Sequence, residues 1–427
     1  MPILEPSLAN LALPPWRRVR QSFPAPPAVD VAAAVAAALD SPETGGAITP
    51  GMRVALGVGS RGIRCIQPLV RAAVAEMLRR GADVFIVPAM GSHGGATAEG
   101  QVAVLVGYGI TEPEVGAPVR TSMDVVQLGA LPDGTPVWFD RIAFTEADAV
   151  VPVARVKPHT DFRGPVESGL LKMLAIGLGK HKGCSTLHRL GLDHFGEVIP
   201  AAGQLVLSRA PVPFGLAVVE NALEEPVLVE AVPRGRMFER EQELLRLARS
   251  YMGRILAPAF DVLVVQEVGK DISGAGMDPN ITGRPMFPVP TWPGRPEYQR
   301  LVVLGLTEAS HGNPGAIGAA DVITRAVFEQ IDLEVTYTNC IASGAPQGAR
   351  IPLMARDDRE ALVVAVRTCL RVDQTRPRIV WIRNTLELGE SRLSEPLWAE
   401  VAGMPGLEAV GEPEPMRFDH RGRLVFE

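Results

Sequence analysis

The glycine-rich segment PAMGSHGGAT (88–97) places one of the chain's seven histidines, His93, where an imidazole could exchange protons with a ligand. It directly follows the apolar run ADVFIVP. Imidazole titrates near neutral pH, and glycines let a backbone approach a ligand closely. We therefore expect His93 to act as a general acid/base, with Gly94 and Gly95 lying against a bound ligand. The alternative is a turn histidine that faces water.

A second concentration of reactive groups lies in RVKPHTDFRGPVESGLLKMLAIGLGKHKGC (155–184), after the apolar run ADAVVPVA. It contains His159, and it places Lys172 within the apolar stretch SGLLKMLAIGLG. Desolvation lowers the pKa of a lysine and makes its amine a nucleophile or a covalent anchor. The alternative is a lysine whose amine reaches water from a helix surface. GLGKHK is not a nucleotide-binding P-loop, because the glycine six residues before Lys180 is missing.

The segment GVGSRG (57–62) matches the glycine pattern of a dinucleotide-binding turn. Such a turn also requires an acidic residue at the end of the next strand, and VFIVPAMG supplies none. Arg61 could instead bind a carboxylate or phosphate through two parallel hydrogen bonds, with Gly59 and Ser60 against the ligand. A solvated arginine in a plain glycine turn is the alternative.

The other histidines carry weaker signals. His181 and His188 share one face of an expected helix and His194 does not, and their spacing fits no zinc motif. His311 lies in a glycine-rich loop, EASHGNPGAIG. The stretch QEVGKDISGAGMDPNITGR (266–284) gathers several ligand-capable side chains, with Lys270 among them, and predicts one wall of a cleft between two domains.

The elements around these segments follow an α/β pattern. From Gly51, a strand (MRVALGVG), a helix (IQPLVRAAVAEMLRRG) and a second strand (ADVFIVPAMG) form one βαβ unit, which predicts a parallel sheet. A charged helix near 238–256 is expected to connect two domains. After it, FDVLVVQEVG begins a second α/β pattern. We predict two α/β domains with mostly parallel sheets, residues 1–256 and 257–427, and the active-site cleft between them.

Composition excludes several classes of protein. The chain has 427 residues, 47% of them hydrophobic, and a net charge of −6. The acidic balance argues against a nucleic-acid-binding protein. No apolar run is long enough for a membrane span, and the first residues do not read as a secretory signal. The four cysteines form no CxxC pair. A cytoplasmic protein is the expectation.

Taken together, GSRG, GSHGGAT, KPHTDFRG…ESGLLKM and a histidine 16 residues after the lysine resemble the lactate racemase family. Those enzymes use a nickel-pincer nucleotide, a pyridinium mononucleotide whose two thiocarbonyl sulfurs and ring carbon hold nickel. The resemblance implies two α/β domains and an isomerase that racemises or epimerises a 2-hydroxy acid. It also implies cofactor-synthesis enzymes as partners that supply the cofactor.

The resemblance assigns roles residue by residue. His93 and His159 correspond to the acid/base pair, and Lys172 to the lysine that forms a thioamide with the cofactor. His188 corresponds to the nickel ligand, with His181 as its competitor. Arg61 corresponds to a substrate-binding arginine.

Three departures from the family pattern point to a 2-hydroxy acid other than lactate. Val58 stands where the family has an aspartate, and the segment between His159 and Lys172 is longer than in the lactate enzymes. Lys270 and GMDPN (276–280) stand in for a glutamine and lysine pair, so Lys270 is a predicted substrate ligand. Two other functions remain open: an NAD-type oxidoreductase on a small hydroxy acid, and a non-catalytic small-anion or nucleotide-binding protein.

Overall fold

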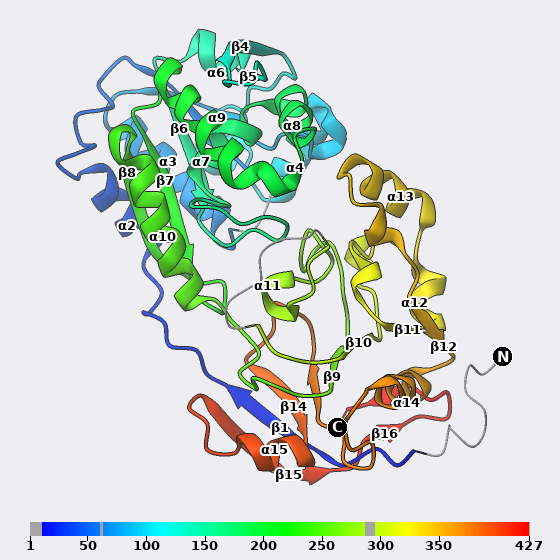
Figure 1. Cartoon of the computed structure of the whole chain (residues 1–427). Coiled ribbons are helices and arrows are strands. Elements are labelled where there is room, and N and C mark those ends of the chain that lie inside the picture. The colour runs from blue at the N-terminus through cyan, green and yellow to red at the C-terminus, as the bar shows by residue number, and fades with distance from the viewer. Residues whose placement is uncertain (1–10, 60–62, 287–294, 427) are drawn as a thin grey trace. The chain divides into compact units, whose positions relative to one another are not determined.

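The computed structural model describes residues 11–59, 63–286 and 295–426 and divides the chain into two compact units (Figure 1). The N-terminal unit comprises Ala25–Met252, and the C-terminal unit comprises Met1–Pro24 with Gly253–Glu427. Each unit has its own sheet and helices, so the predicted α/β fold class is confirmed. The cleft between two domains stays a prediction.

A five-stranded sheet forms the centre of the N-terminal unit, in the order β3-β2-β6-β7-β8. Its first four strands are parallel, and β8 pairs antiparallel with β7. These strands are buried along almost their whole length, as expected for parallel strands covered on both faces. The strands are β2 (Arg53–Val58), β3 (Asp83–Pro88), β6 (Ala149–Arg155), β7 (Phe214–Glu220) and β8 (Pro226–Pro233), beside a separate hairpin of β4 (Val125–Ala130) and β5 (Pro136–Asp140).

Helices complete this unit, and the predicted βαβ unit is present. The helix α3 (Ile66–Arg79) joins β2 to β3 and buries residues at i, i+1, i+4, i+5 and i+8 from Leu69, the spacing of an apolar helix face. The other helices are α2 (Val31–Leu39), α4 (Ala98–Gly107), α5 (Glu112–Val115), α6 (Arg141–Glu146), α7 (Leu170–Lys172), α8 (Lys180–His188), α9 (Phe195–Arg209) and α10 (Met237–Tyr251).

The charged helix expected to connect the domains is instead part of the N-terminal unit. The helix α10 packs against β7, β8 and α7, and it buries Leu244 and Leu245 on one face. Its other charged residues are exposed or half-buried, whereas Glu241 is buried. The many charges in its sequence hide this narrow apolar stripe.

The C-terminal unit holds an eight-stranded sheet in the order β12-β11-β10-β9-β13-β14-β1-β15. The five strands from β12 to β13 are parallel, and the remaining pairs are antiparallel. The bounds are β1 (Trp16–Gln21), β9 (Val262–Val265), β10 (Arg300–Val303), β11 (Val322–Thr324), β12 (Leu353–Ala355), β13 (Ile379–Ile382), β14 (Glu390–Ser394) and β15 (Leu407–Glu414). The helices are α11 (Pro279–Thr282), α12 (Arg325–Gln330), α13 (Leu333–Ala342), α14 (Asp358–Thr368) and α15 (Glu395–Val401), and a hairpin joins β16 (Arg417–Phe418) to β17 (Leu424–Val425).

The strand β1 lies between β14 and β15, although the sequence analysis drew the first domain from residue 1. Trp16 and Val19 are buried, while Arg17 and Arg20 pair with Glu395 and Glu408. The partners of β1 lie more than 360 residues away in the chain, so no local pattern could reveal the pairing.

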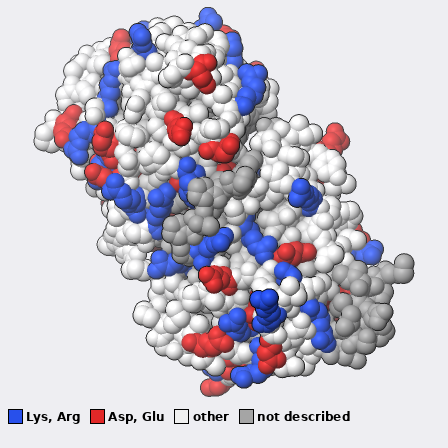
Figure 2. Space-filling view, viewed as in Figure 1, with Lys and Arg blue, Asp and Glu red and all other residues white. Residues whose placement is uncertain are grey.

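Two surface properties bear on function. On the face drawn in Figure 2, acidic and basic side chains are interspersed on both units. Among the described residues, no helix has the length and apolar character needed to cross a membrane.

Replacing Trp16 with alanine should destabilise the C-terminal unit by about 3–5 kcal/mol, because its ring packs on Trp381 and Phe426. Urea unfolding followed by circular dichroism measures the change. The control is Leu223→Ala, at a side chain that is 56% exposed in the N-terminal unit. An unchanged unfolding midpoint for the Trp16 variant would contradict the placement of β1.

Candidate active site

Three neighbouring strand ends bring the predicted segments to one edge of the N-terminal sheet. The strand β2 lies between β3 and β6, and all three run parallel. Gly59 follows β2, the His93 segment follows β3 and the His159 segment follows β6. Ligands of open α/β sheets bind outside the carboxyl ends of the strands. Ser60 and Arg61 lie outside the described residues, so their predicted roles stay predictions.

The His93 segment is a tight loop fixed by its backbone. The Gly91 N–H donates to the Gly177 carbonyl at 3.0 Å, and His93 is exposed at the start of a 3₁₀ turn, Gly94–Ala96. Gly94 has φ +64°, and a Cβ on it would lie 2.5 Å from the Gly100 carbonyl carbon. This glycine is therefore required by the packing of the loop on α4. Contact of Gly94 and Gly95 with a cofactor stays a prediction.

His159 sits in a half-buried loop, and its side chain is 15% exposed. Its Nδ1 accepts the Asp161 N–H at 3.0 Å, so the neutral imidazole carries its proton on Nε2. Burial lowers the pKa of His159 well below its ordinary value, and the nearby positive charges of Lys172 and Lys157 lower it further. His159 is therefore neutral at pH 7.

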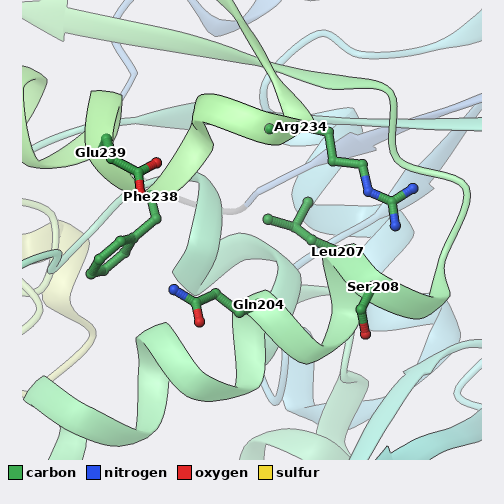
Figure 3. A pocket seen from close by; sticks show the side chains of 7 residues that line it. Gln204, Leu207, Ser208, Arg234, Phe238 and Glu239 are labelled. Carbon is green, nitrogen blue, oxygen red and sulfur yellow. The ribbon is translucent and has the colours of Figure 1, made fainter.

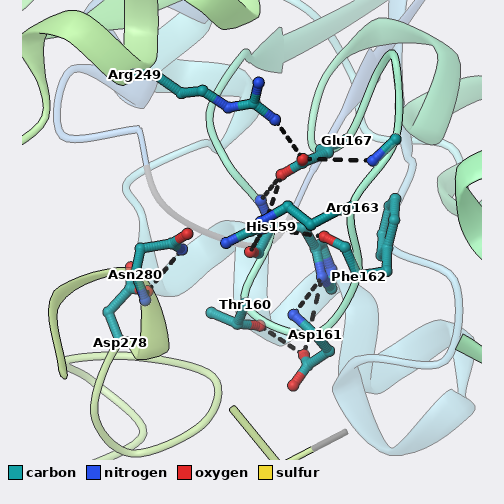
Figure 4. A network of polar contacts seen from close by, with 10 residues as sticks. His159, Thr160, Asp161, Phe162, Arg163, Glu167, Arg249, Asp278 and Asn280 are labelled. Atoms are coloured by element: carbon teal, nitrogen blue, oxygen red, sulfur yellow. Dashed lines mark hydrogen bonds and ion pairs between the residues drawn. The ribbon is translucent and has the colours of Figure 1, made fainter. Parts of the chain in front are cut away.

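A buried carboxylate holds the His159 loop in place (Figure 4). The Glu167 side chain is fully buried, and its oxygens accept the His159 backbone N–H at 2.7 Å and the Arg163 guanidinium at 3.0 Å. Arg249 of α10 donates to the same carboxylate at 2.5 Å. Two guanidinium groups thus balance the charge of Glu167. Glu167 lies within the segment 155–184 singled out from the sequence, but nothing in the sequence indicated this role.

Lys172 ends the short helix α7 and precedes a single π-helical turn, Met173–Gly177. The side chain is half-buried, and the leucines before it are buried. Isolated π-turns occur frequently at functional sites. The location agrees with the predicted burial of Lys172.

Glu241 of α10 lies at the start of the Lys172 helix. Its Oε2 accepts the Leu171 N–H at 2.9 Å, whereas its buried Oε1 has no hydrogen-bond partner among the described residues. Burial raises the pKa of Glu241 to about 7, although the N–H groups of Leu170 and Leu171 oppose the shift. A Cβ at Gly169 would lie 2.5 Å from Oε1, so a larger residue there would require the Glu241 carboxyl group to shift.

His188 is the last residue of α8, and a hydrogen bond to the backbone holds its Nδ1 atom. Nδ1 lies 2.7 Å from the Cys184 carbonyl oxygen, which can only accept, so Nδ1 carries the proton. The Cys184 Sγ lies 3.5 Å from the same nitrogen. The Nε2 atom therefore keeps the lone pair that a metal requires.

Lys172, His159 and His188 share one local environment. Burial acts to lower the pKa of both imidazoles and the positive charge of Lys172 acts in the same direction, although the contacts with Cys184 raise the pKa of His188 overall. The ring of Phe162 lies 4.4 Å from His159, and the ring of Phe195 lies 4.9 Å from His188. The two phenylalanine rings are themselves 5.4 Å apart, so they link the imidazoles.

The other candidate groups do not join this cluster in the N-terminal unit. His181 and His194 are exposed on that unit, and His311 is exposed on the C-terminal unit. Lys270 also belongs to the C-terminal unit, where its Nζ donates to the Gly274 carbonyl at 2.6 Å. Its role as a substrate ligand stays a prediction. Among the described residues, no three His, Cys, Asp or Glu side chains are arranged to hold a metal ion.

A surface pocket of about 280 Å³ lies in the same unit but contains none of the predicted site residues (Figure 3). The α9 residues Gln204, Leu207 and Ser208 line one side of it. Arg234 and the start of α10 line the other. The predicted reactive residues follow the strand ends and do not line this pocket.

Comparison with known proteins agrees with this class of fold, a parallel α/β sheet with imidazoles and an amine at its strand ends. Residues 10–197 match the family model described as the lactate racemase N-terminal domain. This match supports the resemblance of residues 10–197 to the lactate racemase family. No curated protein matches the sequence.

Two solved structures resemble the whole chain. A protein from Thermotoga maritima shares the fold, with a TM-score of 0.51 and 13% identity over 84% of this chain and 96% of its own. The lactate racemase apoprotein from Thermoanaerobacterium thermosaccharolyticum aligns with a TM-score of 0.48 and 14% identity, over 85% of this chain and 82% of its own.

Glu167→Gln should destabilise the N-terminal unit by about 3 kcal/mol, since two guanidinium groups lose the charge that balances them. Urea unfolding measures the loss, and hydrogen exchange should quicken at the amides of residues 157–168. The control is Glu76→Gln, in a surface pair with Arg79, for which less than about 1 kcal/mol is expected. Equal effects of the two substitutions would refute the role given to Glu167.

Glu241→Gln should remove a pH dependence of stability. The folded-state pKa of Glu241 is about 7 against 4.5 for the unfolded chain, so the folded state binds the extra proton between these values. Its contribution to stability is therefore greatest below pH 4.5 and falls by about 3 kcal/mol as pH rises to 8. As the pH rises over that range, the unfolding free energy of the variant should therefore increase relative to that of the wild type. A constant difference would show that Glu241 does not titrate there.

Proposed function

We propose that this protein is a nickel-pincer-nucleotide-dependent racemase or epimerase of a 2-hydroxy acid, acting in the cytoplasm. The observation that carries the proposal is the cluster in which the rings of Phe162 and Phe195 join His159 to His188, within the segment of the chain that also contains Lys172. All three residues lie within the lactate racemase N-terminal domain.

The residues present fit the cofactor. His188 would bind nickel through Nε2, because Nδ1 is held by the Cys184 carbonyl in the arrangement typical of metal-binding histidines. Lys172 would attach the nucleotide through its amine. When bound, the cofactor supplies hydride acceptance and return. Enzymes that synthesise the cofactor are required partners.

Chemistry at an unactivated alcohol carbon explains why two imidazoles are needed. The C–H bond is too weakly acidic for direct proton removal, whereas loss of hydride from carbon and a proton from oxygen gives a planar keto acid. Return of the hydride to the opposite face of the keto acid inverts the configuration at that carbon. His93 and His159 would each handle the hydroxyl proton of one enantiomer.

The tautomer of His159 determines how it performs that role. In the present arrangement Nε2 carries the proton and donates a hydrogen bond to the substrate oxygen. To accept a proton at Nε2, the ring must carry hydrogen on Nδ1. The Asp161 Oδ2 lies 3.8 Å from Nδ1, so it would have to move closer to accept that hydrogen bond.

The substrate carboxylate would be bound by Arg61 and by Lys270, and the family departures at Val58 and near Lys270 favour a 2-hydroxy acid other than lactate. The positive groups around His159, which include Lys157, Lys172 and Arg163, favour an anionic substrate there despite the net negative charge of the chain.

The reaction is tested with protein produced together with the cofactor-synthesis enzymes. Single enantiomers of 2-hydroxy acids and sugar acids are incubated with it and separated by chiral chromatography. Substrate deuterated at C2 should be inverted slowly, with the deuterium retained, because the hydrogen moves as hydride. Loss of deuterium to water would exclude hydride transfer. NAD reduction by the nickel-free protein would favour an oxidoreductase, and ligand binding without turnover would favour a binding protein.

Substitution of His188 should remove the metal. In His188→Ala, the nickel content of the purified protein should fall at least about tenfold, whereas His181→Ala, on the exposed part of the same helix, should retain it. Intact mass should show a nucleotide adduct that Lys172→Ala lacks. Nickel loss in the His181 variant alone would reverse the assignment.

A further inference from the structure

A fully buried lysine lies beside the candidate site without a role in the proposed reaction. Lys180 has no exposed surface, and its Nζ lies 2.6 Å from the Pro88 carbonyl oxygen, 3.0 Å from Asp140 Oδ2 and 3.3 Å from Gln101 Oε1. An ammonium group has three protons, and here each has an acceptor. The backbone of Lys180 has φ +54°, in the left-handed region that residues with a side chain rarely adopt.

The contact with Gln101 fixes the direction of that amide. Because the oxygen of Gln101 faces a cation, its NH₂ group must point the other way. It donates to the Gly91 carbonyl at 2.9 Å and lies 3.3 Å from the His93 carbonyl. Gln101 is itself fully buried. The carbonyl groups on either side of Ser92 are thus attached to Lys180 through one side chain.

Lys180 is also the first residue of the nine-residue helix α8, and His188 is the last. A second set of contacts joins the same loop to this helix, because the Ser92 Oγ lies 3.6 Å from the Cys184 Sγ. The His93 loop is therefore held at the first residue and at the middle of the helix that presents His188.

We propose that Gln101 and Lys180 are positioning residues that place the His93 imidazole relative to His188. The inference rests on the proposed function, in which His93 exchanges the substrate proton and His188 binds the metal. A 1 Å misplacement of a reacting group can cost about 10²-fold in rate, so this anchor determines turnover without touching the substrate.

The Lys180–Asp140 pair and the contacts of Gln101 with the His93 loop can be tested separately. This allows a positioning role to be distinguished from a structural one. Lys180 and Asp140 neutralise each other in the core, and Asp140 Oδ1 also accepts the Ala143 N–H at the start of α6. That part stabilises the fold. The amide of Gln101 adds only the contacts to the loop, so changing its donor end tests the positioning role.

The test variant is Gln101→Glu. The carboxylate keeps an oxygen beside Lys180 and the same size, but it has no N–H to give to the two carbonyls and repels them. We expect a wild-type nickel content and a melting temperature close to that of the wild type. We expect kcat to fall about 10²-fold with KM changed less than about threefold, and the pH–rate limb of His93 to shift. Hydrogen exchange should quicken at residues 90–97 and stay unchanged along α8.

The control is Glu360→Gln, a conservative exchange at a buried residue of the C-terminal unit whose Oε2 accepts the Arg356 N–H. It should leave kcat and the His93 loop unchanged. If Gln101→Glu does not fold, the same measurements are made on Gln101→Met, whose side chain has a similar length and no charge.

Each outcome decides between the two roles. Unchanged kcat and unchanged exchange at residues 90–97 would overturn the proposal, and so would a fall in kcat with nickel loss and faster exchange along α8, which indicates a general structural role. If the wild-type protein racemises no 2-hydroxy acid, the proposed function fails, and the exchange of residues 90–97 still decides whether Gln101 anchors the loop.

Discussion

Buried charges in the N-terminal unit must be matched by protein groups, because no water reaches them, and this requirement fixes the backbone around the candidate site. Removing an ion from water costs several kcal/mol unless partners replace the solvent. Glu167 binds the His159 loop, Glu241 binds the start of the Lys172 helix, and Lys180 binds the His93 loop through Gln101. Each charged group thus holds one of the segments that carry reactive side chains.

The same arrangement sets the protonation states of the site. The positive charges of Lys172, Lys157 and Arg163 act on an imidazole that is already desolvated, so His159 stays neutral. A neutral imidazole that carries its proton on Nε2 can donate a hydrogen bond from that atom. The local positive potential also favours an anionic substrate, which the composition of the whole chain does not predict.

Local sequence signals predicted the elements that end in reactive segments. The strand before His93 and the strand before His159 are continuous apolar runs, and glycines mark the turns that follow them. Long-range contacts were not predictable in this way. The strand β1 pairs with strands near the other end of the chain, and Glu241 reaches the Lys172 helix across 70 residues of sequence. Lys180 was recognised only as part of an incomplete phosphate-loop pattern, because its acceptors come from separate elements.

The glycines near Lys172 show how closely the strand ends approach the π-turn. A Cβ at Gly59 would lie 2.7 Å from the Met173 Cε, and a Cβ at Gly177 would lie 2.6 Å from the Ala89 carbonyl oxygen. The residue after Lys172 is therefore packed directly against the ends of β2 and β3. Because the π-turn is wider than an α-helical turn, it rotates the residues on either side of it relative to each other. The close approach at Gly177 involves the backbone of Ala89, so a larger residue at this position could not fit without moving the chain that follows β3.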